Sequence, residues 1–210
     1  PEVILLDDAF QHRKVKGGLN ILLTSYSNLY VNDFMLPTGN LRENKKGARR
    51  AEIIIVTKCP SDLSEKEQKK IIKKLRPTIY QNVFFTYIEY DTILKGDNSI
   101  NISELNNKEV ILVTGIANST PLVKHLHNEG IIFKHLEYGD HHNFTDKDLE
   151  KIKTIQSNNK VVLTTEKDYV RIFDKLKKLY YLPIETKFIN RKSDFDNIIK
   201  KYVEQSSRNS

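Results

Sequence analysis

The sequence contains a single cysteine and no tryptophan. Cys59 is alone among 210 residues, so no disulfide can form within the chain. Proteins that keep their thiols free usually belong to a reducing compartment. Because Cys59 follows directly after an apolar run, we expect an inert thiol rather than a nucleophile.

Long apolar runs are missing as well. No stretch approaches the ~18 consecutive apolar residues that a membrane-spanning helix needs, and the N-terminus shows no secretory signal. The chain begins with Pro1 instead of methionine and enters an apolar run at once. We interpret this beginning as that of a fragment of a longer protein.

Acidic residues are outnumbered by basic ones. Lys and Arg total 34 and Asp and Glu total 27, which gives a formal net charge of +7. Such a balance suggests a polyanionic partner: a nucleic acid, an anionic lipid or a phosphorylated substrate. A lysine-rich proteome with solvated lysines explains the charge equally well. The apolar share of 39% and the charged share of 29% are those of an ordinary globular protein.

What the sequence does contain is a regular alternation of short apolar runs and amphipathic segments. This order predicts an α/β fold: mostly parallel sheets with flanking helices, in a first block and a second, smaller α/β/α block. Strands are expected at 2–6, 19–24, 51–57, 82–90, 109–115, 131–138 and 160–165, and helices at 64–77, 118–130, 145–156 and 165–178.

The same alternation predicts how the chain divides. We expect a first domain at 1–90, a linker at 91–105, a C-terminal α/β domain at 106–192, and a terminal helix with a polar tail at 193–210. The segments 82–90 and 180–189 are expected to cross between the two blocks and to pair as a two-stranded connector. Ligands of such sheets bind beyond the carboxyl ends of the strands.

Asp7 and Asp8 follow the first apolar run. Two adjacent carboxylates repel each other unless a cation lies near them. An apolar strand that ends in Asp is what nucleotide-binding sheets use to hold Mg²⁺, directly or through water. A plain turn, in which Asp is also common, is the alternative.

Arg42 and Glu43 follow a turn that Pro37 and Gly39 predict. The guanidinium fork of arginine matches phosphate oxygens, and the glutamate is a candidate second metal ligand. A surface ion pair in a loop is the simpler alternative.

Asp140, His141 and His142 stand between a predicted strand and a predicted helix. A carboxylate beside an imidazole orients it and raises its basicity, which suits acid–base chemistry near neutral pH. Adjacent side chains point in different directions, so only one of the two histidines is expected to act. The alternative is a loop that merely caps a helix. Further along, the start of the helix at Thr165 favours an anion, and Asp168 is expected to be an ordinary helix cap.

Five stretches in a fixed order resemble the tetraacyldisaccharide 4′-kinase family, the lipid A 4′-kinases of Gram-negative bacteria. They are "LLDDAFQHR", "LPTGNLRE", "VTGIANSTPL", "GDHHNF" and "TTEKDYVRI", and they run from about Glu2 to about Arg171. The resemblance implies a P-loop kinase that transfers the γ-phosphoryl group of ATP to the 4′-hydroxyl of a lipid A disaccharide 1-phosphate. It also implies Mg²⁺ as cofactor and peripheral contact with the bacterial inner membrane at its cytoplasmic face.

The resemblance carries over to particular residues. The family's DDGxQH motif acts as a Walker B element and matches Asp7, Asp8, Gln11 and His12, with alanine in place of the usual glycine. Asp7 and Asp8 are therefore expected to be catalytic and metal-binding residues, although which of them touches the ion stays open. Gln11 is expected at the nucleotide.

Two further matches complete the expected site. The glutamate of the family's LRE motif binds Mg²⁺ and matches Glu43, and its neighbour Arg42 is expected at a phosphate. The histidine of the DH motif matches His141, which the family pairs with an aspartate of the first domain.

The P-loop signature G-x-x-x-x-G-K-[S/T] is absent, since none of the eight glycines is followed by lysine. The resemblance implies that the P-loop, the partner aspartate and a membrane anchor precede Pro1. The isolated chain is therefore expected to be inactive.

Two other classes of protein remain as alternatives. "GDHH" is similar to the signature of DHH-type phosphoesterases, but the glycine-rich element that those hydrolases carry downstream is missing. A basic nucleic-acid-binding module would show a basic stripe interleaved with exposed aromatic residues, which this chain lacks. No nucleic-acid partner is expected.

Overall fold

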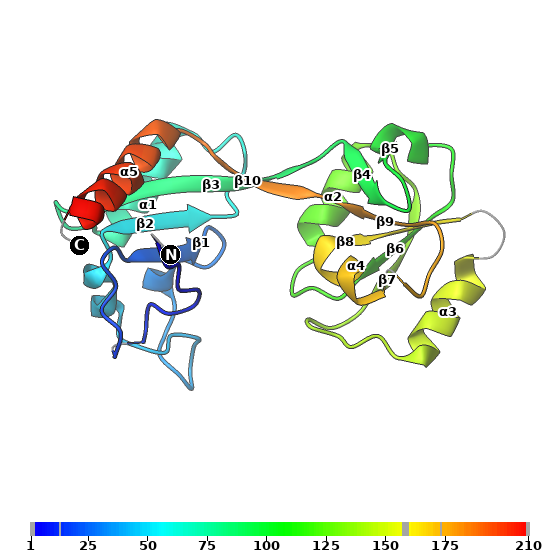
Figure 1. Ribbon diagram of the computed structural model, residues 1–210, viewed down its shortest axis with the longest axis horizontal. Coiled ribbons are helices and arrows are strands. Elements are labelled where there is room, and N and C mark those ends of the chain that lie inside the picture. The colour runs from blue at the N-terminus through cyan, green and yellow to red at the C-terminus, as the bar shows by residue number, and fades with distance from the viewer. Residues whose placement is uncertain (1–2, 13, 157–159, 173, 209–210) are drawn as a thin grey trace. The chain divides into compact units, whose positions relative to one another are not determined.

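The computed structural model describes residues 3–12, 14–156, 160–172 and 174–208. The chain divides into two compact units (Figure 1). Unit 1 comprises Pro1–Ile88 and Thr186–Ser210, and unit 2 comprises Glu89–Glu185. The C-terminal segment thus returns to the unit in which the chain began.

Unit 1 is built on a four-stranded sheet in the order β1-β2-β3-β10. β1 pairs with β2, and β2 with β3, in parallel. The elements of this unit are β1 (Ile21–Ser25), η1 (Tyr30–Asn32), η2 (Lys45–Arg50), β2 (Ile53–Thr57), α1 (Glu65–Leu75), β3 (Asn82–Tyr90), β10 (Ile184–Phe188) and α5 (Lys192–Arg208).

Both faces of the unit 1 sheet are covered. Ile54 and Val56 of β2 pack in one apolar cluster with Ile71 of α1, whereas Ile53 and Ile55 pack in another with Phe195 of α5. Side chains of a strand alternate between the two faces of its sheet. A strand that is buried on both faces therefore consists almost entirely of apolar residues, as "IIIV" does.

Helix α1 begins and ends where local sequence signals predict. Ser64 accepts a hydrogen bond from the backbone of Glu67, and the Glu67 side chain accepts one from Ser64, which forms a capping box. Arg76 closes the helix in the left-handed conformation, with φ of 49°. The proline that follows cannot continue the helix.

Unit 2 is built on a six-stranded sheet in the order β5-β4-β9-β8-β6-β7. The strands β7, β6, β8 and β9 are mutually parallel neighbours, and β4 and β5 extend the sheet antiparallel. The elements are β4 (Ile93–Gly96), β5 (Ile100–Asn101), η3 (Ile102–Leu105), β6 (Val110–Thr114), α2 (Thr120–Asn128), β7 (Phe133–Glu137), α3 (Asp146–Gln156), β8 (Val161–Thr165), α4 (Glu166–Ile172) and β9 (Leu179–Leu182). The predicted α/β class with mostly parallel sheets and flanking helices is confirmed.

The prediction of a linker at 91–105 is wrong. This segment contains β4, β5 and η3, and the side chains of Leu94 and Leu105 are fully buried. Its Lys, Gly, Asp and Asn residues made it look like a loop. Five apolar residues spread among them are enough to anchor two short strands at the edge of the sheet, β4 against β9 and β5 against β4. The boundary at 193 is also corrected, because α5 begins at Lys192 and packs in unit 1.

The prediction of a strand at 2–6 is also wrong. Val3–Leu6 adopt no regular structure, and Ile4 and Leu5 are 72% and 92% exposed. An apolar run becomes a strand only when a neighbouring strand supplies its hydrogen bonds. No described segment pairs with this run.

The expected connector is confirmed in its pairing. β3 and β10 are neighbours in the unit 1 sheet, and the unit boundaries at Ile88 and Thr186 fall within these two strands. None of the described helices combines the length and the apolar composition that crossing a bilayer requires.

Candidate functional site

The first motif forms a turn. The Asp8 backbone is left-handed, with φ of 48°, and its N–H donates to Oδ1 of Asp7 over 3.0 Å. The N–H of His12 donates to the carbonyl of Ala9 over 2.8 Å. Both aspartates and Gln11 are exposed. The turn that was the alternative for these residues is therefore their local geometry, and the prediction that they end a strand is wrong.

The second motif is shaped by Asp33. Its carboxylate accepts backbone hydrogen bonds from Phe34 over 2.7 Å and from Asn40 over 3.2 Å, which fastens the two ends of the loop between them. These bonds, that of Phe34 above all, lower the pKa of Asp33. A side chain at Gly39 would collide with the Phe34 carbonyl and the Asp33 carboxylate. These contacts fix the backbone conformation of the loop that leads into Arg42 and Glu43.

Two arginines bring the first and second motifs together. Nη1 of Arg42 lies 3.4 Å from Oδ2 of Asp8, between side chains that are both exposed. Arg50 donates to the two carboxylate oxygens of Glu43 over 3.0 and 2.6 Å, and to the carbonyl of Phe10 over 3.0 Å. Its guanidinium also lies 4.8 Å from the centroid of the Phe10 ring. Residues more than thirty positions apart in sequence thereby form one surface of unit 1.

Arg50 is the residue of this surface that the sequence did not reveal. Its side chain bonds to the Glu43 carboxylate, which raises the pKa of Arg50. The Glu43 carboxylate also lies against Gly47, where an added Cβ would sit 2.6 Å from Cδ of Glu43. In a run of basic residues from 45 to 50, no local pattern marks which one pairs with a carboxylate.

The carboxylates of this surface have the right chemistry for Mg²⁺, which prefers oxygen ligands and is commonly held by one or two carboxylates together with phosphates and water. Asp8 and Glu43 lie on linked segments, but each is engaged by an arginine. Within the described ranges, no group of three or more His, Cys, Asp or Glu side chains gathers around one point. The residues therefore fit an ion that phosphates help to hold, and not an ion held by protein ligands alone.

The third motif lies in unit 2, and His141 is its most exposed imidazole. The His141 backbone is left-handed, with φ of 58°, and its N–H lies near two acceptors: Oδ1 of Asp140 at 3.0 Å and the carbonyl of Gly115 at 3.2 Å. Its side chain is 72% exposed, with Nε2 3.8 Å from Oδ2 of Asp140. Lys167 donates to Asp140 over 3.0 Å, and this bond is the main reason that the pKa of Asp140 is lowered.

His142 points elsewhere, as expected for the second of two adjacent side chains. Its Nε2 lies 3.0 Å from Oδ2 of Asp148, and its ring stacks on Tyr138 at 4.7 Å between centroids. Asp148 also accepts hydrogen bonds from the hydroxyl and the N–H of Thr145, and these lower the pKa of Asp148 to about 2. His142 is thus part of the packing that joins β7 to α3.

Helix α4 packs against the loop that carries His141 and holds it in place. Asp168 is fully buried and accepts hydrogen bonds from the N–H of Gly115 over 2.7 Å and from the hydroxyl of Thr165 over 2.9 Å. Arg171 donates to the carbonyl of His142 over 3.2 Å. The expectation that Asp168 is an ordinary cap is incomplete, because the same carboxylate also holds the end of β6.

The anion expected at the start of α4 has no support in the geometry. The hydroxyl of Thr164 donates to the carbonyl of Val113, and the hydroxyl of Thr165 donates to Asp168. The first turn of this short helix carries the acidic residues Glu166 and Asp168. Negative charges already occupy the end of the helix that attracts them.

Cys59 is a buried thiol, as expected. It is 7% exposed, and its Sγ lies 3.4 Å from the carbonyl of Val56. Burial raises the pKa of Cys59 to about 11. A thiol protonated near neutral pH is a poor nucleophile.

Each unit is a mostly parallel sheet with flanking helices, so the chain is an α/β protein, and its candidate functional residues lie on loops of both units. The model of the family described as "Tetraacyldisaccharide-1-P 4'-kinase" matches residues 1–204. The chain belongs to this family, as the order of its motifs predicts.

Known relatives agree with this membership. The chain is 50% identical over 209 residues to the tetraacyldisaccharide 4'-kinase of Flavobacterium johnsoniae. This alignment covers 98% of this chain and 61% of that protein. It is 49% identical to that of Flavobacterium psychrophilum, covering 100% of this chain and 62% of that protein. The chain thus spans about three-fifths of the length of these relatives.

A solved structure also resembles this fold. The crystal structure of LpxK from Aquifex aeolicus in complex with ATP aligns with a TM-score of 0.66 and 26% sequence identity, over 94% of this chain and 56% of that one.

Proposed function

We propose that this chain is the distal part of an ATP-dependent kinase that phosphorylates the 4′-hydroxyl of the tetraacyldisaccharide 1-phosphate precursor of lipid A. The observation that carries the proposal is the family match over residues 1–204. The relatives bear the name of this kinase, and the similar Aquifex aeolicus structure contains ATP. In this proposal, unit 1 is the distal part of a P-loop-kinase-like nucleotide domain.

Mg²⁺ would be held by Asp7, Asp8 and Glu43 together with phosphate oxygens of ATP. A bound Mg²⁺ neutralises the charge that develops on the transferred phosphoryl group. Arg42 and Gln11 would contact phosphates or the nucleotide from the same surface. The 3.4 Å approach of Arg42 to Asp8 supports this assignment, because it brings a phosphate-binding side chain to the aspartate pair.

His141 would act on the sugar hydroxyl, directly or by orienting another group. Its exposure of 72% leaves the imidazole accessible to a substrate, while Asp140 lies beside it. Asp7, Asp8 and Glu43 belong to unit 1 and His141 belongs to unit 2. Their cooperation in one active site therefore stays a prediction.

The substrate of this reaction is a lipid, so the proposal includes peripheral contact with a membrane. We place this contact at the cytoplasmic face of the bacterial inner membrane, where ATP is available. The substrate disaccharide would be presented at the bilayer surface.

The test is transfer of radiolabelled phosphate from ATP to the disaccharide precursor. A protein that carries this chain together with a P-loop segment should label the precursor on its 4′-hydroxyl. The 210-residue chain alone should give no turnover, since no P-loop signature stands in its sequence. Labelling by the isolated chain, or none by the longer protein, would contradict the proposal.

Magnesium titration of the longer protein tests the metal ligands. Asp8→Ala and Glu43→Ala should each shift the activity midpoint to higher Mg²⁺. Glu52→Ala, which removes another carboxylate of unit 1, is the control. Midpoints of both site variants that coincide with the control would reject these ligands.

A further inference from the structure

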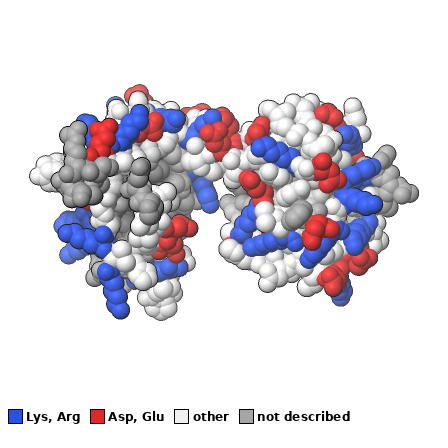
Figure 2. Space-filling model, in the orientation of Figure 1, with Lys and Arg blue, Asp and Glu red and all other residues white. Residues whose placement is uncertain are grey.

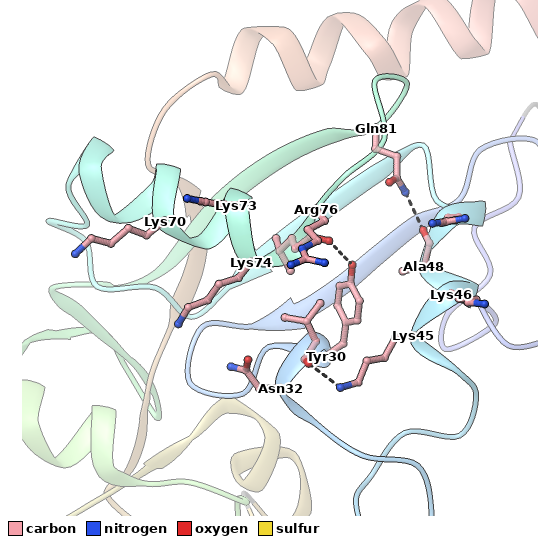
Figure 3. A pocket seen from close by; sticks show the side chains of 13 residues that line it. Tyr30, Asn32, Lys45, Lys46, Ala48, Lys70, Lys73, Lys74, Arg76 and Gln81 are labelled. Atoms are coloured by element: carbon pink, nitrogen blue, oxygen red, sulfur yellow. Dashed lines mark hydrogen bonds between the residues drawn. The ribbon is translucent and has the colours of Figure 1, made fainter.

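We propose that a basic groove of unit 1, separate from the Asp8–Arg42 surface, docks the protein onto anionic phospholipid headgroups of a bilayer. The inference deepens the proposed function, on which it rests for the presence of a membrane. The groove has a volume of about 850 Å³ and is lined by thirteen residues of η1, η2, α1 and the segments next to them. Figure 3 shows Lys70, Lys73 and Lys74 of α1 on one side and Lys45 and Lys46 of η2 on the other.

Positive charge dominates the lining. Seven of the thirteen residues are basic and none is acidic; the basic ones are Lys45, Lys46, Arg49, Lys70, Lys73, Lys74 and Arg76. All seven are exposed. The face of unit 2 visible in Figure 2, in contrast, mixes both signs of charge.

These cations lack a carboxylate partner in the part of the chain that the structure describes. No ion pair links any of the seven to a carboxylate among the residues that the structure describes. The neighbouring Arg50, by comparison, forms an ion pair with Glu43. Concentrated like charges without acidic counter-charges destabilise a fold, and a polyanionic surface relieves their repulsion.

The groove has a fixed frame. The Tyr30 hydroxyl of η1 donates to the carbonyl of Leu75 at the end of α1 over 3.5 Å. The Gln81 side chain donates to the carbonyls of Ala48 and Ala51, each over 2.8 Å. The two segments that carry the charges, η2 and the end of α1, are therefore each tied to an uncharged wall of the groove before any ligand binds, which reduces the entropy lost on binding.

Exposed apolar side chains border the charges. Their presence favours a bilayer over a soluble phosphate as the ligand of the groove. Phe34 is 64% exposed, and Nζ of Lys45 lies 5.4 Å from the centroid of its ring. Ile79 and Tyr80, which come just before Gln81, are 91% and 82% exposed. Basic residues beside solvent-exposed apolar ones are the composition of surfaces that lie in the headgroup region of anionic membranes. A soluble phosphate would use the charges but not the apolar border.

The experiment is co-sedimentation of the 210-residue chain with vesicles, in the absence of ATP and substrate. The chain should bind vesicles of phosphatidylcholine that contain phosphatidylglycerol, and should not bind vesicles of pure phosphatidylcholine. Binding should weaken steeply as salt rises, because the screening length falls from about 8 Å at physiological ionic strength to about 3 Å at 1 M.

A matched pair of double variants identifies the surface. Lys70→Gln/Lys74→Gln removes two groove charges one helical turn apart on α1. Each basic residue near an anionic surface changes the affinity about fivefold, so the double variant should bind about 30-fold more weakly. Lys147→Gln/Lys151→Gln removes two exposed lysines with the same spacing on α3 of unit 2 and should bind almost as the unchanged chain does.

Three results would overturn the inference. They are equal losses in the two double variants, equal binding to neutral and anionic vesicles, and release by inorganic phosphate that exceeds release by chloride of the same ionic strength. The last result would assign the groove to a free phosphate ligand. Because neither ATP nor substrate is present, failure here leaves the phosphate-transfer assay untouched, and the two proposals fail separately.

Discussion

Oδ2 of Asp168 lies 2.7 Å from the backbone nitrogen of Gly115, and this hydrogen bond joins α4 to the end of β6 inside unit 2. The carbonyl of Gly115 in turn accepts from the N–H of His141 over 3.2 Å. A single residue, Gly115, thus separates a fully buried carboxylate from the candidate catalytic histidine. Lys167 and Arg171 of the same helix contact Asp140 and the backbone of His142, so α4 holds this loop directly at two points and through Gly115 at a third.

Asp168→Asn should destabilise the protein by about 1–3 kcal/mol, because it removes the charge from buried hydrogen bonds and leaves an amide N–H without an acceptor. Urea denaturation of the 210-residue chain measures the change. Glu166→Gln, an exposed change in the same helical turn, is the control and should have little effect. Equal midpoints for the two variants would show that the Asp168–Gly115 bond adds no stability.

His141→Ala in the longer, active protein should lower kcat by about 10²- to 10⁴-fold, the usual loss for a general base. The apparent affinity for ATP should stay unchanged, because the histidine belongs to the other unit from the aspartate pair. Steady-state kinetics with varied ATP separates the two effects. A His141→Ala enzyme with the original kcat would reject the histidine's role.

His142→Ala should instead reduce stability while most of kcat remains. The substitution removes the stack on Tyr138 and the contact with Asp148, together worth about 1–2 kcal/mol. Urea denaturation and kinetics of the same preparation give both quantities. If His142→Ala costs more kcat than His141→Ala, the two histidines have been assigned the wrong way round.

Arg42→Lys should behave like Arg42→Ala in the kinase assay. A lysine keeps the charge but lacks the two parallel donors that match a phosphate. The exposed Arg42 contacts Asp8 over 3.4 Å, and loss of a surface contact of this length should leave the fold of both variants unchanged. Circular dichroism checks the fold, and full activity of Arg42→Lys would argue against a bidentate phosphate contact.

The pKa of about 2 for Asp148 predicts a pH effect on stability. The folded-state pKa lies below the unfolded value of about 3.9. The stabilisation is therefore present above the unfolded value and is lost as the pH falls towards 2. Asp148→Asn should be less stable than the unchanged chain near neutral pH, and the difference should shrink between about pH 4 and pH 2. A difference that is constant across this range would contradict the cause assigned to the shift.

Cys59 should react slowly with a disulfide reagent at pH 8 in the folded chain and rapidly in urea. Its burial and its pKa of about 11 leave little thiolate in the folded state. Absorbance of the released thiol measures both rates. Equal rates would show that the thiol is accessible, and Cys59→Ala without loss of kinase activity would exclude a catalytic role.

The sequence by itself determined the elements whose signals are local. The run "IIIV" of β2 is apolar throughout because both faces of the strand are covered, and the capping box of Ser64 and Glu67 marks the start of α1 within four residues. The order of five short motifs identified the family for the same reason: each motif is contiguous, so its residue types are visible without a structure.

Only the tertiary structure decided which distant residues meet. The Arg50–Glu43 pair, the Asp168–Gly115 bond and the assembly of two basic segments into one groove join positions that no local pattern relates. The same reason explains the two corrections at 2–6 and 91–105. Whether a segment becomes a strand depends on the neighbour that completes its hydrogen bonds: none of the described segments pairs with Val3–Leu6, whereas β9 accepts β4 despite its polar surroundings.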